Sequence, residues 1–379
     1  MATSVRSTDS PRPTSSTPFT SSPHATGNTG KAGSTVHDAI ARLREVRARS
    51  RRRPLWVSLA LVIALLGTMM VRVLLGSYTV TIPDFFTIIH GGTVEGARAA
   101  NFIVLSDKLP RAVLGLLAGA AFGASGAIFQ LLLRNPLASP DIIGISSGAS
   151  LGAVLAIVFW GASGFTVSVF AVVFSLAVAV AIMLLSAGQG SVGNRFILMG
   201  IGVAALGSAV VSYLMSRTST NTAQAAAVWM TGSLSIANWN RITILLILLC
   251  VLLPLVALLH KKVHTMAVGE ELAHGIGLNV SATRWTFIVL GVLLAAVATA
   301  ATGPIAFVAF VSGPIARRLI GGRHSIFASA LVGAIIVVLA DFIAANYMPG
   351  GALPVGILTG ALGAPVLIWL LTQSQKEGK

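Results

Sequence analysis

The chain has 379 residues, of which 55% are hydrophobic and only 10% are charged, and its mean hydropathy is +0.87. Soluble globular proteins carry about 25% charged residues, so this composition excludes a soluble protein and predicts an all-α polytopic membrane protein. The formal net charge of +15 does not indicate nucleic-acid binding, because ten of the 26 Lys and Arg residues precede residue 54.

The first 54 residues differ from the rest of the chain. Residues 1 to about 35 are rich in Ser, Thr, Pro and Gly, and we expect them to be disordered because they cannot bury enough apolar surface to offset the entropy of folding. The basic run ARLREVRARSRRR at 41–53 predicts a collar on anionic lipid. We therefore divide the chain into a cytoplasmic tail (1–54), a transmembrane domain (55–372) and a C-terminal tail (373–379).

Ten apolar segments follow, most of them near the length that crosses a bilayer. They lie at about 55–75, 112–133, 142–160, 165–186, 194–216, 241–260, 284–303, 305–320, 325–347 and 353–372, and the eighth is short and interrupted by Gly and Pro. With the N-terminus inside, the inner segments contain 20 Lys and Arg residues and the outer segments and span edges contain six. The positive-inside rule then predicts that both termini are cytoplasmic.

The stretch LLRNPLASPDIIGISSGASLG at 132–152 joins the second and third spans at the inner face. Ser139, Pro140 and Asp141 predict the N-cap and first turn of the third span. Glycines four residues apart predict small-residue ridges that let helices approach closely. These ridges are Gly144, Gly148 and Gly152 in the third span, Gly115, Gly119 and Gly123 in the second, and Gly356 and Gly360 in the tenth. We expect the glycine-rich second, third, fifth and tenth spans to line a pathway.

The inner loop between the sixth and seventh spans, residues 261–283, contains a predicted docking element. Val268, Leu272 and Ile276 are four residues apart and form an apolar stripe on a short helix. Glu270 and Glu271 suit its first turn, and Gly277 suits its end. The pattern indicates a helix that presents an apolar ridge and two charges to another protein.

Other site chemistries fit the sequence poorly. The tail stretch GNTGKAGS lacks the first Gly and the final hydroxyl of a phosphate-binding loop, so we expect no ATP site in this chain. His260 and His264 lack the glutamate of a metalloprotease helix, and we expect no metal site. Asp341 is the main acidic residue inside a span and should face protein or water; it leaves ion-coupled secondary transport as the rival class.

Residues 55–372 resemble the FecCD-type permeases, which import iron-siderophores and vitamin B12 through ABC transporters. The matching motifs are the GEE-A--LG element within 269–278, KLPRAVLGLLAGAAFGASGAIFQLLLRNPLASPDIIGISSGAS at 108–150, GPIAFVAF at 303–310, GGRH at 321–324, LAD at 339–341 and LPVGILTGALGAPVLIWLL at 353–371. Two positions depart from the family pattern: Gly313-Pro314 stands where Pro-His is frequent, and Ala352 where Glu is frequent. The GGRH and FVAF variants are most similar to catecholate siderophore permeases.

The resemblance implies a bacterial cytoplasmic-membrane permease with two related halves, which carries a ferric siderophore and needs no cofactor. Vitamin B12, haem or another metal chelate is the alternative cargo. The implied partners are two cytoplasmic ATPase subunits, which hydrolyse the ATP, a second permease subunit and an extracytoplasmic binding protein. In the family, the ATPase contact corresponds to Val268, Gly269, Glu270, Glu271, Leu272, Ala273, Gly275, Ile276 and Gly277.

The resemblance also suggests how the outer face meets its partners. Basic residues in the LPR region of the family can meet acidic side chains of the binding protein, which implies docking by Lys108 and Arg111; alternatively, both only anchor the second span at the interface. The second outer region, 339–356, contains no cation, and Ala345 stands where some members carry Arg. We therefore expect an unlike permease partner that supplies the missing basic contacts.

Overall fold

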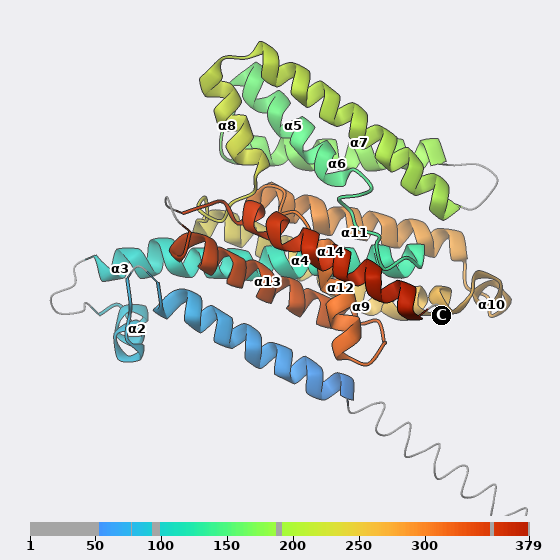
Figure 1. The fold of residues 1–379 in the computed structure, drawn as a ribbon, viewed down its shortest axis with the longest axis horizontal. Helices are drawn as coiled ribbons and strands as arrows, with labels where there is room; N and C mark the ends of the chain where they lie inside the picture. Colours follow the sequence, from blue (N-terminus) through green and yellow to red (C-terminus); the bar gives the residue numbers. More distant parts are fainter. Residues whose placement is uncertain (1–52, 77, 93–98, 187–191, 349–351, 378–379) are drawn as a thin grey trace, which may run out of the picture. The chain divides into compact units, whose positions relative to one another are not determined.

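The computed structural model describes residues 53–379 except 77, 93–98, 187–191, 349–351 and 378–379. The predicted tail at 1–52 lies outside the described residues. Regular structure in the described part of the chain is entirely helical (Figure 1). Ten helices match the ten predicted apolar segments, so the all-α expectation is confirmed.

Seven of these helices are long and apolar enough to cross a membrane. They include Arg53–Leu74, α4 (Leu109–Leu133), α6 (Phe165–Ser186), α7 (Val192–Arg217), α9 (Trp239–Val268), α11 (Val280–Thr302) and α13 (Ile326–Asn346). Helices α5 (Ile145–Trp160) and α14 (Val355–Glu377) are apolar over shorter stretches, and α12 (Val308–Leu319) has 12 residues.

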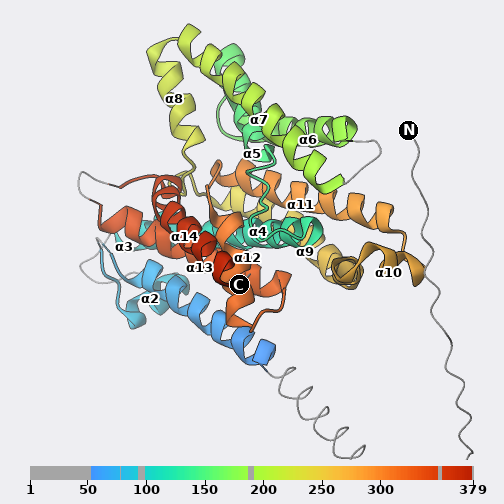
Figure 2. The ribbon, with the colours of Figure 1, turned by 45° about the vertical axis from the view of Figure 1, so that its right-hand side comes forward.

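Helix α4 forms the core. In the most apolar 18-residue window of the helix Ala100–Leu133, 83% of the residues are buried, against 17% in Arg195–Arg217. It packs against α9, α11, α12 and α13, whereas α5 to α8 form a second group that meets the first mainly through α11 (Figures 1 and 2). Helix α4 is therefore enclosed by its own subunit, and α7 presents most of its surface outward.

Four features were missed by hydropathy. They are α2 (Ile82–Ile89), α3 (Ala100–Phe102), the π-helical turn Ile103–Lys108 that continues into α4, and α8 (Thr220–Met230). All are short or lie between spans, so no membrane-length apolar run announces them. The short helix predicted in the loop 261–283 is present as α10 (Glu270–Gly275).

The predicted start of the third span is wrong. Residues 140–144 form turns, and α5 begins only at Ile145 with Gly144 as its N-cap. Gly144 has a φ of +92°, a left-handed conformation that interrupts the helical path and that glycine adopts without strain. Ser139 Oγ accepts a hydrogen bond from the Ile142 N–H at 3.3 Å, so it stabilises the preceding turn and does not cap α5.

Candidate functional site

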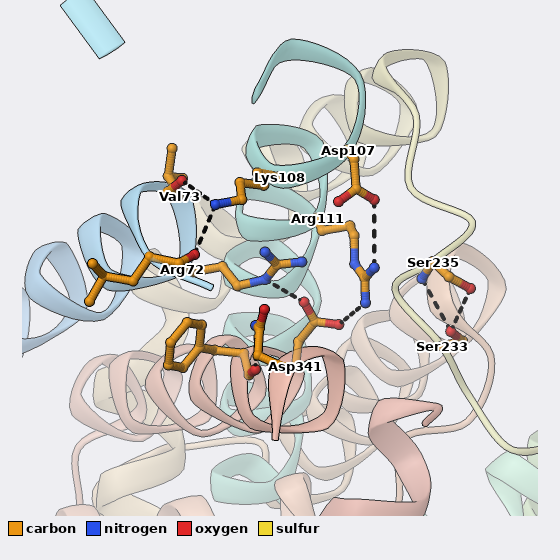
Figure 3. Close-up of polar contacts among 11 residues, drawn as sticks. Arg72, Val73, Asp107, Lys108, Arg111, Ser233, Ser235 and Asp341 are labelled. Atoms are coloured by element: carbon orange, nitrogen blue, oxygen red, sulfur yellow. Dashed lines mark hydrogen bonds and ion pairs between the residues drawn. The ribbon is translucent and has the colours of Figure 1, made fainter. Parts of the chain in front are cut away.

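A buried charge cluster joins three helices at one end of the bundle (Figure 3). We call Arg72, Asp107, Lys108, Arg111 and Asp341 the Asp341 cluster. The Arg72 Nε donates to Asp341 Oδ2 at 2.7 Å, and Arg111 Nη2 donates to Asp341 Oδ1 at 2.8 Å. Asp341 is 1% exposed, so both carboxylate oxygens are paired inside the protein. Asp341 is therefore the buried polar residue that the sequence predicted.

Lys108 fulfils a different role in the same cluster. Its Nζ donates to the carbonyl oxygens of Val73 at 3.2 Å and Leu75 at 2.9 Å, and to that of Tyr78. These acceptors lie at or just after the end of the helix Arg53–Leu74, where carbonyl groups have no partner within the helix. A cation at this position satisfies them and suits the negative end of the helix dipole.

The predicted docking role of Lys108 and Arg111 is therefore wrong for this structure. Lys108 is 3% exposed, and the Arg111 side chain is 11% exposed and contacts Asp341 and Asp107. Both residues bind α4 to neighbouring helices. This agrees with the alternative hypothesis that they anchor the second span. The sequence does not single out Arg72 as a partner of Asp341; the signal it offers is three cations near span edges together with one carboxylate inside a span.

The glycine ridge of α4 packs as predicted. A β-carbon at Gly119 would lie 2.7 Å from Ala334 Cα, and one at Gly123 would overlap the Ser329 carbonyl group. At Gly115 it would lie 3.0 Å from Leu234 Cδ1. Helices α4 and α13 therefore touch backbone to backbone. Because α4 is enclosed, its glycines pack helices within the subunit, and the pathway role of the second span stays a prediction.

The other two ridges divide between different contacts. Gly148 and Gly152 face α6, where a β-carbon at Gly148 would lie 3.0 Å from the Phe174 carbonyl oxygen. Gly144 lies outside the helix and meets Gly200 and Ala204 of α7, so the three residues do not share one helix face. Gly356 meets the Thr231 carbonyl group, whereas no described atom lies within 4 Å of a β-carbon at Gly360.

Helix α10 and the residue after it present part of the apolar stripe predicted for the loop 261–283. Leu272 is 59% exposed, Ile276 is 66% exposed, and Ala273 is buried beneath them. Gly277 has a φ of +83°, the left-handed conformation predicted at the helix end. Val268 is the last residue of α9 and does not belong to α10, because Gly269 separates the two helices.

Two titratable groups near the predicted inner face lie outside the spans. Burial raises the pKa of the Asp141 carboxyl above its usual value, although a hydrogen bond from Ser146 opposes the shift. Among the residues that the structure describes, none donates a hydrogen bond to Asp141 Oδ2. Burial and then the charges of Arg317 and His264 lower the pKa of His324. Among the described residues, Asp141 thus has no cationic partner, whereas Asp341 is paired with two arginines.

Comparison with known proteins confirms the predicted family resemblance. The family model described as the FecCD transport family matches residues 61–373. The Fe(3+)-citrate import system permease protein YfmE of Bacillus subtilis is 35% identical over 85% of this chain and 96% of its own length. The ferric enterobactin transport system permease protein FepG of Escherichia coli is 35% identical over 80% of this chain and 91% of its own.

A third relative and a solved structure extend the comparison. The iron(3+)-hydroxamate import system permease protein FhuG of Bacillus subtilis is 35% identical over 74% of this chain and 86% of its own. An inward-facing structure of a metal-chelate type ABC transporter superposes with a TM-score of 0.74 at 25% identity, covering 84% of this chain and 99% of that one.

Proposed function

The chain belongs to the FecCD transport family, and from this membership we propose that it carries a ferric siderophore across the bacterial cytoplasmic membrane. It is a multi-pass permease subunit of an ABC importer, and ATP hydrolysis resides in a separate chain. An ATPase and a binding protein are its partners in transport. Family membership favours an ABC importer over the alternative hypothesis of an ion-coupled secondary transporter. That hypothesis depended on Asp341, which is paired with two arginines.

The similarity to three relatives supports iron(III) chelates as the cargo class. Their names specify citrate, enterobactin and hydroxamate, and each is 35% identical to this chain. Equal identity to the three gives no preference for a catecholate, so the proposal is restricted to what they share: iron(III) held by an organic chelator. Vitamin B12, haem and other metal chelates stay as alternative cargo.

Uptake of radioactive iron by a deletion strain tests the cargo. Cells that lack this permease receive ⁵⁵Fe bound to citrate, a catecholate or a hydroxamate, and the gene is then restored. We expect one chelate to lose uptake on deletion and to regain it on restoration. Labelled vitamin B12 and haem serve as the comparison, and restoration of their uptake alone would contradict the iron proposal.

We propose that α10 and its flanks, residues 268–277, receive the ATPase. The exposed apolar side chains of Leu272 and Ile276 support this, because an apolar ridge in an aqueous loop favours a protein partner. The two acidic residues at the start of α10 add charges that a basic partner would complement. ATP binding in the ATPase partner would move the transporter between states, because the partner contacts each state differently.

We propose that α7 and α14 line the pathway and meet the second permease. Apart from the neighbouring residues and backbone of its own helix, no described atom lies within 4 Å of a β-carbon at Gly202 of α7 or Gly360 of α14. Large side chains such as Leu206 and Leu362 are also exposed on these helices. Both faces are thus available to another protein, whereas α4 is not.

We propose cytoplasmic N- and C-termini. An even number of crossings keeps both ends on one side, and the excess of Lys and Arg in the segments assigned inside selects that side. A cysteine-accessibility experiment tests this: Ser281→Cys, next to α10, should react with a membrane-impermeant maleimide only in opened cells. Ser219→Cys, in the turn before α8, should react in intact cells.

A further inference from the structure

An apolar groove opens on the membrane side of the bundle between α6 and α9, with α11 as its floor. Its volume is about 240 Å³, and its walls are almost entirely hydrocarbon. The main wall residues are Phe165, Val169, Val173, Leu245, Leu248 and Val297. Phe165 and Val173 are more than half exposed, so the groove is open to its surroundings.

One charged residue, Arg241, lines this groove. It lies in the first turn of α9, two residues after Trp239, and is half-buried. Its guanidinium Nη1 makes only long contacts, 3.4 Å to Ser168 Oγ and 3.5 Å to the Ala301 carbonyl oxygen. Among the described residues, no carboxylate lies within 4 Å of it. A guanidinium has five N–H donors, and in the described part of the chain only Nη1 donates, to these two oxygens.

The depth of Arg241 matches the level of lipid headgroups. Trp239 has a polar edge, which donates to the Leu105 carbonyl oxygen at 3.1 Å, and an otherwise 48% exposed ring. Such tryptophans mark the interface between membrane and water. From Arg241 to Leu248 the helix rises about 10 Å, which lies within the roughly 15 Å depth of one leaflet's hydrocarbon.

We propose that this groove binds an anionic glycerophospholipid, with its phosphate on Arg241 and one acyl chain along α6 and α9. The apolar walls accept the chain, and the guanidinium accepts the phosphate through charge-assisted hydrogen bonds. The leaflet is the one at the Trp239 end of α9, which is the outer leaflet in the proposed orientation. The site does not depend on the identity of the cargo.

A second groove in the same molecule gives an internal comparison. It lies between α12, α13 and α14, has a volume of about 200 Å³ and is also apolar, with lining residues such as Val311, Ile343 and Leu362. No charged residue lines it. It offers nothing to a phosphate, so headgroup selectivity in this chain should depend on Arg241.

Native mass spectrometry of the assembled transporter tests the proposal. Purified complex is titrated with phosphatidylglycerol or with diacylglycerol of the same chains, which lacks the phosphate. One cation near a membrane surface corresponds to about fivefold in affinity. We therefore expect about fivefold preference for phosphatidylglycerol in wild type, its loss in Arg241→Gln, and its retention in Arg241→Lys.

Arg217→Gln is the matched control, because Arg217 ends α7 outside the groove and is exposed. Its selectivity should equal that of wild type. Thermal unfolding of each complex, with and without the lipid, separates misfolding from lost binding: phosphatidylglycerol should raise the midpoint of wild type and Arg241→Lys but not of folded Arg241→Gln. Equal selectivity in Arg241→Gln and wild type, or occupation of the groove by a protein subunit in a cross-linking experiment at Val173, would overturn the proposal.

Discussion

At the residue scale, Asp341 balances two arginine side chains in the interior of the bundle. Asp341→Asn would remove the carboxylate, leave Arg72 as a buried charge without a counterion and leave Arg111 with only the exposed Asp107. Breaking a buried ion pair in this way costs about 3–5 kcal/mol. We expect a large fall in the yield and thermal midpoint of the purified protein, measured by fluorescence-detected size-exclusion chromatography after heating.

Asp107→Asn provides the control for this substitution. The Asp107 side chain is 52% exposed and lies 3.5 Å from Arg111, so solvent screens the pair. Exposed pairs contribute less than about 1 kcal/mol, and the midpoint should change little. If the two variants unfold at the same temperature, the Asp341 cluster does not stabilise the fold.

Asp141 should show the opposite effect. Its pKa is higher in the folded than in the unfolded protein, so the folded state binds the proton more tightly and stability falls as pH rises above the unfolded value. Asp141→Asn removes a buried charge and should raise the thermal midpoint at neutral pH, with a smaller gain near pH 4. Glu271→Gln, at an exposed acid, should give no gain. A lower midpoint for Asp141→Asn at neutral pH would mean that the carboxylate has a compensating partner.

The Asp341 cluster also shows where prediction from sequence reaches its limit at this scale. The sequence predicted a buried Asp341 from the cost of charge in a membrane. It did not reveal the partners, because Arg72 and Arg111 lie 269 and 230 residues away along the chain. The sequence does not show that three helices meet there. It therefore predicts that Lys108 and Arg111 dock a partner at the outer face.

At the scale of helices, close backbone contact excludes a side chain at Gly123, whereas Gly202 makes no such contact and has room for one. Gly123→Ala would push a β-carbon into the Ser329 carbonyl group of α13, and such overpacking costs about 1–3 kcal/mol. Gly202→Ala meets no described atom within 4 Å, and alanine favours a helix by about 0.5–1 kcal/mol. Thermal unfolding in detergent should therefore move in opposite directions. A stable Gly123→Ala variant would show that α4 and α13 can separate without loss.

Helix α10 should transmit ATP hydrolysis to the membrane domain. Glu270→Lys combined with Glu271→Lys reverses two charges in a loop outside the lipid, so insertion should be normal while the ATPase contact loses several kcal/mol. We expect loss of uptake and of ATPase co-purification. Lys261→Glu, at an exposed position on the last turns of α9, is the charge-reversal control and should retain both. Unchanged uptake in the double variant would contradict the assignment of α10.

Helices were predictable to the extent that lipid selects their composition. A spanning helix needs a long apolar run, and hydropathy alone predicts the seven helices that have one. Helix α8, TNTAQAAAVWM, is mixed in polarity and has only one buried residue, so no such rule identifies it. The start of α5 depends on the left-handed Gly144, a choice of backbone conformation that the Ser-Pro-Asp cap pattern did not reveal.

At the scale of the whole molecule, we expect the enclosed helix α4 and the outward-facing helices α7 and α14 to have different roles in transport. Helix α4 connects α9, α11, α12 and α13 through close contacts and is suited to move with them as one body. Helices α7 and α14 have outward faces, and a pathway between two subunits requires such faces. Gly360→Leu should therefore weaken pairing of the permeases, which native mass spectrometry can count. Gly67→Leu is the matched control, since Gly67 is equally open but lies on the helix Arg53–Leu74.

The identity of the second permease is the last prediction, and we expect an unlike chain. A two-fold pair of identical subunits would offer the same outer surface to both lobes of a binding protein. Lys108 is buried and Arg111 is paired with Asp341 and Asp107, so they do not supply docking cations to such a pair, and the outer region 339–356 contains none. A different partner can provide them. Native mass spectrometry of the transporter from its own host should show two permease masses; one permease mass present twice, with full iron uptake, would establish a homodimer instead.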